Sequence, residues 1–254
     1  MILNKLIMKS TIGQVSEYFS FDFEKIDGFD YSLVKTNEFD ILQGNFEIGV
    51  LPLSSIPIQN NPLVIAALSE RAEPRVIFFI RKKAFTGPGA FGFPKNAQVF
   101  SDFPFYLTQL KYIRPDIQVI QNPEEADLIV GHEDVLYLEN EFLKFPIHPS
   151  EITPMAGSGV WVCLVHKENF ELRKKLVQIH QFEVAKLTNV ERKISHHLKG
   201  IDHGINIYTD QNSFYHMNIA VWTQGNLKRV KLSSSTLLNF ERDALKALEI
   251  SGGN

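Results

Sequence analysis

The sequence predicts an α/β protein with two lobes, each a mixed sheet with flanking helices, followed by a small C-terminal α+β domain. Over residues 1–180, short apolar runs alternate with helical patterns, which is typical of α/β architecture. After residue 180, one long helical pattern is followed by alternating segments joined by turns. A chain of 254 residues is long enough to bury more than one core.

The expected strands are short runs rich in Val, Ile, Leu or Phe, several of them bounded by Gly, Pro or Asn. In the first 180 residues they lie at 2–8, 46–51, 63–68, 76–80, 97–100, 117–120, 127–130 and 160–165. Helices are expected between them at 11–19, 33–43, 105–113, 133–143 and 169–178.

Two segments rich in glycine and proline interrupt this alternation, at 87–94 and at 145–158. The first reads as a loop because no phosphate-binding motif follows it, and the second suits a crossover between lobes. We therefore expect 1–70 with 155–167 to form the first lobe and 73–150 an inserted second lobe. Residues 168–254 then supply connecting helices and the C-terminal domain, with a helix to residue 199, strands at 204–209, 213–223 and 227–233, and a closing helix at 234–247.

Composition excludes several classes of function. The formal charge of −3 gives no reason to expect a nucleic-acid partner. Cys163 is the single cysteine, so an intrachain disulfide and a thiolate zinc site are excluded. The first ten residues are too short and too interrupted for a signal peptide, and no apolar run reaches the roughly 18–20 residues of a membrane span. We expect a cytoplasmic protein without a membrane partner.

Five short stretches, in order along the chain, resemble the porphobilinogen deaminase (hydroxymethylbilane synthase) family. The stretches are LVKTNE with FEIGV at 33–50, SERAEPR at 69–75, FP through QL to RPD at 93–116, the strand entry that begins at Pro154 at 154–165, and VER with LKG at 190–200. The resemblance implies two lobes similar to periplasmic solute-binding proteins, and a transferase of tetrapyrrole and heme biosynthesis. It also implies a dipyrromethane cofactor held on a cysteine.

The sequence departs from that pattern where the family's chemistry resides. Ser55 stands where the resemblance implies a catalytic aspartate, and Asp202 where it implies the anchoring cysteine. The positions equivalent to the family's cofactor-binding residues are Lys9, Ser10, Ser54, Ser101, Phe105 and Tyr106. The first 70 residues hold four lysines, no arginine and nine acids, a net charge of 4 − 9 = −5 that repels a polycarboxylate. We therefore expect a catalytically degenerate member without a bound cofactor.

Three functions remain open on this reading. The first is a degenerate deaminase that acts as a ligand-binding or regulatory protein in tetrapyrrole synthesis. The second is a divergent but active deaminase that uses Asp102, Asp202 and Lys9. The third is a cleft-type solute-binding protein of unrelated specificity, which binds a small molecule between its lobes. The sequence leaves the oligomeric state undetermined.

A histidine cluster near the end of the long helix is the remaining candidate site. It comprises His196, His197, Asp202 and His203. Adjacent residues on a helix point about 100° apart, so His196 and His197 do not converge on one ion. We expect these side chains to be solvated or to cap the helix, and we expect no metal site.

Overall fold

The computed structural model describes residues 8–16, 21–56, 62–132 and 140–249. Its contacts divide the chain into two units. Unit 1 comprises Met1–Ala72 and Gly159–Lys186, and unit 2 comprises Glu73–Ser158 and Leu187–Asn254. The segment 168–186, which the sequence groups with the C-terminal region, belongs to unit 1.

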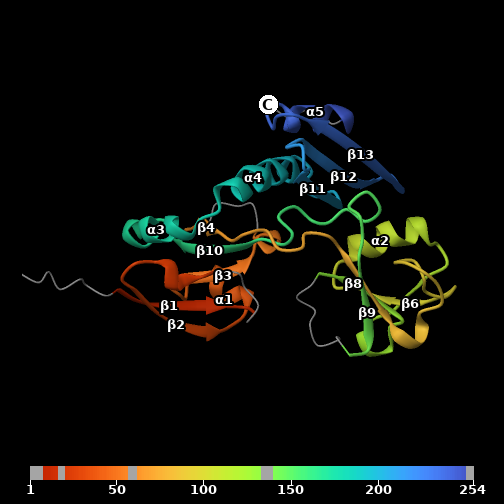
Figure 1. The fold of residues 1–254 in the computed structure, drawn as a ribbon, viewed down its shortest axis with the longest axis horizontal. Helices are drawn as coiled ribbons and strands as arrows, with labels where there is room; N and C mark the ends of the chain where they lie inside the picture. The colour runs from red at the N-terminus through yellow and green to blue at the C-terminus, as the bar shows by residue number, and fades with distance from the viewer. Residues whose placement is uncertain (1–7, 17–20, 57–61, 133–139, 250–254) are drawn as a thin grey trace, which may run out of the picture. The chain divides into compact units, whose positions relative to one another are not determined.

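Unit 1 is built on a five-stranded mixed sheet (Figure 1). Its strand order is β2-β1-β3-β10-β4, with β1 parallel to β2 and β3, and β10 antiparallel to β3 and β4. The strands are β1 (Met8–Gln14), β2 (Phe29–Lys35), β3 (Ile48–Pro52), β4 (Leu63–Leu68) and β10 (Trp161–His166). Helices α1 (Glu38–Leu42) and α3 (Phe170–Leu176) belong to the same unit.

Apolar residues fill both faces of the unit 1 sheet. On one face Val50 and Cys163 pack with Leu172 of α3, and on the other Leu51 packs with Ile41 of α1. A Cβ atom on Gly49 would lie 2.1 Å from Ile41 Cγ2, so only glycine lets α1 approach β3 this closely. Burial on both faces explains why β3 and β10 read as continuous apolar runs in the sequence.

Two helices expected in this unit are strands instead. Residues 11–19 and 33–43 were expected to be helical, but β1 occupies 8–14 and β2 occupies 29–35. Ser10, Ile12 and Gln14 on one face of β1 are buried and Thr11 on the other face is exposed, while Gly13 is buried against Phe46. The helix after β2 is only α1, which Asn37 caps by accepting a hydrogen bond from the Asp40 backbone N–H. The strand expected at 2–8 lies, except for its last residue, outside the described residues.

The first sheet of unit 2 repeats the arrangement of unit 1. Its order is β7-β6-β8-β5-β9, with β6 parallel to β7 and β8, and β5 antiparallel to β8 and β9. The strands are β5 (Ile77–Arg81), β6 (Gln98–Phe100), β7 (Gln118–Val119), β8 (Leu128–Gly131) and β9 (Phe142–Pro146). In each sheet a parallel trio is therefore followed by one strand of opposite direction and then by a strand antiparallel to that one.

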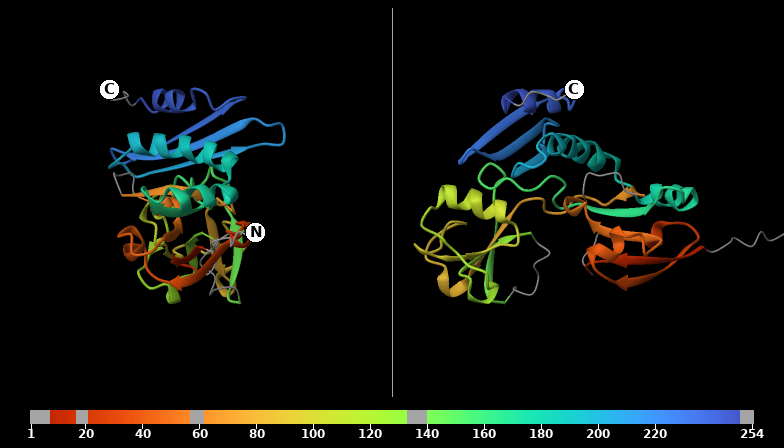
Figure 2. Two further views of the ribbon diagram at one scale, coloured as in Figure 1. Left: turned by 90° about the vertical axis from the view of Figure 1, so that its left-hand side faces the viewer. Right: turned by 180° about the vertical axis from the view of Figure 1, so that it is seen from behind.

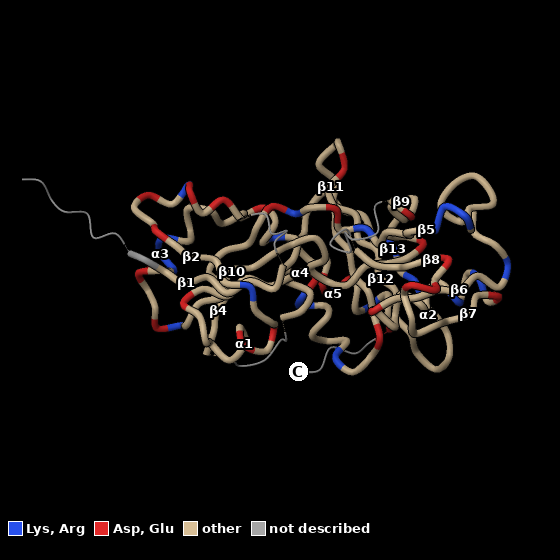
Figure 3. The backbone as a smooth tube through the Cα atoms, turned by 90° about the horizontal axis from the view of Figure 1, so that it is seen from below, with Lys and Arg blue, Asp and Glu red and all other residues tan. Residues whose placement is uncertain are grey.

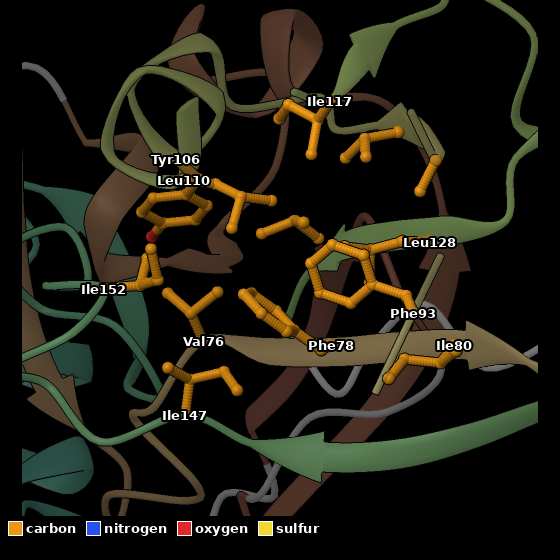
Figure 4. Packing of buried hydrophobic residues seen from close by; sticks show 13 residues of the cluster. Val76, Phe78, Ile80, Phe93, Tyr106, Leu110, Ile117, Leu128, Ile147 and Ile152 are labelled. Atoms are coloured by element: carbon orange, nitrogen blue, oxygen red, sulfur yellow. The ribbon is translucent and has the colours of Figure 1, made fainter. Parts of the chain in front are cut away.

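Helix α2 (Pro104–Ile113) closes the core over this sheet (Figure 4). Phe78 of β5 packs with Tyr106 and Leu110 of α2 and with Phe93 from the loop before β6. The loop at 87–94 is confirmed, with Gly89 in the left-handed region at φ +80°. The helix expected at 133–143 lies mostly in residues outside the described ones, and its last two residues are in β9.

The C-terminal part of unit 2 is a three-stranded antiparallel sheet, β11 (His203–Thr209), β12 (Tyr215–Thr223) and β13 (Asn226–Ser234). Helix α5 (Phe240–Ala247) lies along one face of this sheet (Figure 2), and α4 (Phe182–His197) contributes Ile194 to the same core. Residues 234–239, expected in the closing helix, precede it. The predicted fold class, two α/β lobes with mixed sheets and a small C-terminal α+β domain, is confirmed.

One buried carboxylate joins three segments of unit 2. Glu191 of α4 is fully buried, and its two oxygens accept hydrogen bonds from the backbone N–H groups of Gly157 at 2.8 Å and Ile207 at 2.7 Å. Gly157 belongs to the loop that follows β9, and Ile207 to the middle of β11. Glu191 therefore connects α4, this loop and the C-terminal sheet.

We predict that Glu191→Gln lowers the free energy of unfolding by about 1.5–3 kcal/mol, because an amide can accept only one of the two hydrogen bonds and places N–H against N–H at the other. Urea denaturation followed by circular dichroism measures the loss. Glu183→Gln is the matched control, since the Glu183 side chain is 80% exposed on the same helix and its replacement should change stability by less than about 0.5 kcal/mol. Equal stability of the two variants would contradict the role assigned to Glu191.

Candidate functional site

The topology of unit 1 places its candidate site at the carboxyl end of β1. The chain runs from β1 to β2 on one side and later to β3 on the other, so the strand order reverses between β1 and β3. In open α/β sheets, ligands bind outside the carboxyl ends of the strands at such a reversal. Gln14 is the last residue of β1 and lies opposite Val50 of β3.

Gln14 carries an unused acceptor at this position. Its side chain is 6% exposed, and its Oε1 has no hydrogen-bond partner among the residues that the structure describes. A buried polar atom left without a partner costs about 1–3 kcal/mol. Ser54 and Ser55 lie in the short 3-10 helix η2 (Leu53–Ser55), which follows β3 at the same edge of the sheet. The carboxyl edge of unit 1 therefore combines an unsatisfied buried amide with two exposed or partly exposed hydroxyls.

Unit 2 has a corresponding reversal between β6 and β8. Ser101 follows β6 and donates a hydrogen bond from its hydroxyl to the Val130 carbonyl of β8 at 2.6 Å, while the same oxygen accepts from the Phe103 backbone N–H. His132 follows β8, and its Nε2 lies 2.8 Å from the Tyr106 hydroxyl. The first turn of α2 begins at the same edge. This edge presents polar side chains that hydrogen bonds already hold in fixed orientations.

The structure separates the site residues that the sequence singled out. Phe105 and Tyr106 are buried in α2, where Phe105 packs on Ala220 and Leu227 of the C-terminal sheet. Lys9 and Ser10 lie in β1; Ser10 is buried, and its hydroxyl has no partner within the described part of the chain. The remaining positions, Ser54, Ser55 and Asp202, fall in different units: the two serines in unit 1, and Asp202, which is exposed before β11, in unit 2.

The histidine cluster does not converge on one point. His203 is bound to its neighbours, with Nδ1 2.6 Å from the Ile201 carbonyl and Nε2 2.7 Å from the Ser195 hydroxyl, and His197 lies 3.1 Å from Glu241. Over the described ranges, no group of three or more His, Cys, Asp or Glu side chains could hold a metal ion. The absence of a metal or cofactor stays a prediction.

Figure 3 shows Asp and Glu distributed over the segments around β1, β2 and α1. Within the described ranges, no helix is long and apolar enough to cross a membrane.

Sequence reasoning missed Gln14, His132 and a third residue, Asn206. Gln14 lay inside a segment expected to be helical, so its place at a strand end was hidden. His132 directly follows the buried run at 128–131, and a polar residue just after such a run marks a strand's carboxyl end. Asn206 is the polar residue between Ile205 and Ile207 in β11, a pattern that ordinarily means a solvent-facing side chain.

Comparison with known proteins gave structural neighbours alone: no family model and no curated protein matches the chain. One similar structure is a probable amino-acid ABC transporter extracellular-binding protein, ytmK, from Bacillus subtilis, with 8% identity over 68% of this chain and 91% of that chain (TM-score 0.49). Another is an amino-acid ABC transporter substrate-binding protein from Streptococcus pneumoniae bound to L-arginine, with 12% identity, coverage of 71% and 88%, and TM-score 0.44. YhfZ from Shigella flexneri has 12% identity, coverage of 73% and 88%, and TM-score 0.42.

These findings correct the interpretation as a porphobilinogen deaminase of tetrapyrrole or heme synthesis, which no family model or curated relative supports. The motif residues have local structural roles instead. Arg114 binds Asp116 through two hydrogen bonds of 2.8 Å, which hold the pKa of that carboxyl well below its usual range, and it lies 4.4 Å over the Phe93 ring. The Glu191 carboxylate accepts hydrogen bonds from two backbone N–H groups in unit 2. The expected cytoplasmic location has no support from these neighbours, one of which is a probable extracellular-binding protein.

We predict that acidification destabilises the fold through His203. Burial lowers the pKa of His203 below its ordinary 6.5, in spite of the Ile201 carbonyl and Asp202, which raise it. As the pH falls, the unfolded chain therefore binds this proton at a higher pH than the folded chain does. The contribution of neutral His203 to the free energy of unfolding is complete above about pH 7.5 and decreases as the pH drops toward about 5.5.

Urea denaturation at several pH values between these limits tests this prediction. His203→Gln should show a shallower dependence of the unfolding free energy on pH than the wild type. His166→Gln, which removes an exposed imidazole at the end of β10, is the control and should keep the wild-type slope. An unchanged slope in His203→Gln would overturn the assignment.

Proposed function

We propose that this protein is a solute-binding protein that takes a small polar molecule at the carboxyl edge of the unit 1 sheet. The observation that carries the proposal is Gln14, a buried amide with an unused acceptor at the strand-order reversal of unit 1. Natural proteins satisfy nearly all buried polar atoms, so an exception at the expected ligand position supports a ligand as the missing partner.

The repeated sheet topology supports the same function. Both units carry a parallel trio of strands with one order reversal, and each reversal has polar side chains at its carboxyl edge. At the edge of unit 2, Ser101 and His132 are fixed by hydrogen bonds. Pre-oriented polar groups bind a ligand with little loss of side-chain entropy.

A thermal-shift screen followed by calorimetry tests the proposal. The panel comprises amino acids, monosaccharides and dicarboxylates, and it includes L-arginine because one similar structure contains it. We expect at least one compound to raise the melting temperature by mass action. Gln14→Leu should weaken that compound's binding about tenfold or more, since a leucine of similar volume offers no hydrogen bond.

Ser10→Ala is the matched control. Ser10 lies in the same strand with a buried hydroxyl that also has no partner in the described part of the chain, but four residues before the carboxyl end of β1. Its replacement should leave affinity unchanged. A panel without any stabilising compound, or unchanged affinity in Gln14→Leu, would refute the proposed site.

A further inference from the structure

A cavity lies within unit 2, beside the start of β5 and the end of β9. Its volume is about 230 Å³, and its apolar walls come from Pro74, Pro149 and the ring of Tyr208. Its polar lining comes from four side chains, Glu73, Arg75, His148 and Asn206. The volume falls below the roughly 300–1,000 Å³ of pockets for drug-sized ligands, so an occupant must be smaller.

Four of the lining side chains are each held by a partner. Glu73 accepts from Arg75 Nε at 2.8 Å and from its Nη2, and these bonds lower the pKa of Glu73, which keeps the carboxyl ionised. His148 Nδ1 accepts from the Ser150 backbone N–H at 3.2 Å. Tyr208 stacks on His216 with ring centroids 5.2 Å apart. The lining is therefore preorganised, which favours binding over rearrangement.

Asn206 is the exception, because nothing holds its amide. The side chain is 1% exposed, and neither its Oδ1 nor its Nδ2 has a hydrogen-bond partner among the described residues. Ile205 and Ile207, its neighbours in β11, face the opposite side of the sheet and pack in the C-terminal core. A buried amide with two unused functions in a cavity needs a partner that supplies both an acceptor and a donor.

We propose that this cavity binds a small zwitterion, an α-amino acid with a short side chain. A carboxylate alone accepts from Asn206 Nδ2 and from the remaining N–H donors of Arg75, but it leaves Asn206 Oδ1 unsatisfied. An amine alone leaves Nδ2 unsatisfied. An amino acid provides a carboxylate for Arg75 and Asn206 Nδ2, and an ammonium group for Asn206 Oδ1 and Glu73. The Glu73–Arg75 pair matches the two charges of such a ligand.

This inference goes beyond the proposed function, because the cavity is lined by none of the residues named at the strand-order reversals, Gln14, Ser101 and His132. It assigns a second, effector-type site to the part of unit 2 where the segment before β5, the segment after β9 and β11 meet.

Calorimetry and thermal shift with glycine, L-alanine and L-serine test the assignment, with propionate and ethylamine as probes that carry only one of the two charges. We expect at least one of the amino acids to bind and both single-charge probes to bind at least tenfold more weakly. Asn206→Leu should keep or raise the melting temperature of the free protein, since it removes an unsatisfied amide, and it should abolish the ligand-induced shift.

Asn218→Leu is the matched control, because Asn218 is the cross-strand partner of Asn206, is also buried, and does not line the cavity. Arg75→Gln, at a partly exposed position, provides a second variant should Asn206→Leu fail to fold, and it should weaken binding about tenfold. Gln14→Leu should leave this binding unchanged, which separates the two sites. The assignment is overturned if none of the three amino acids binds, if propionate binds as tightly as L-alanine, or if Asn206→Leu or Arg75→Gln binds as tightly as the wild type.

Discussion

The buried carboxylate of Glu191 determines how unit 2 is put together. By accepting from Gly157 and Ile207 it joins α4, the loop after β9 and the C-terminal sheet. That sheet then lies so close to the loop that Gly204 of β11 has no room for a side chain: a Cβ atom would lie 2.4 Å from the Thr153 carbonyl oxygen. The cavity lined by Asn206 exists because β11 is held at this distance from the segments at 73–75 and 148–149. Strand β11 thus supplies both the Ile207 N–H group that Glu191 binds and the Asn206 side chain that lines the cavity.

The fold class could be predicted because most strands are marked in the sequence by a short apolar run. The runs at β4, β5, β8 and β10 are apolar on both faces, and breakers bound several of them. The wrong secondary-structure predictions concern strands that are polar on one face or that end early. β1 reads MKSTIGQ and β2 reads FDYSLVK, and neither carries the apolar run of a strand buried on both faces. The pairing of β1 with β3 and of β2 with β1, which the local sequence does not encode, decides their conformation.

The candidate sites were harder to predict than the fold. Gln14, His132 and Asn206 are ordinary polar residues whose significance comes from burial and from partners distant in the sequence. Motif matching failed for the opposite reason. In the strings RPD and ERAEPR, a basic and an acidic residue two positions apart form a local ion pair, Arg114 with Asp116 and Arg75 with Glu73. A local ion pair is sufficient reason for such a string, so its presence says little about chemistry.

The place of β10 in the sheet of unit 1 has a consequence for the order of events during synthesis. Strands β1 to β4 are translated first, yet β10 lies between β3 and β4 and supplies the hydrogen bonds that connect them. The first sheet of unit 2, by contrast, uses only the continuous segment from β5 to β9. On the ribosome, where domains fold as units, the later-made sheet can therefore be complete before the earlier one. Until residue 166 emerges, the N-terminal strands are nascent chain with open β3 and β4 edges, the stage at which a chaperone has most to protect.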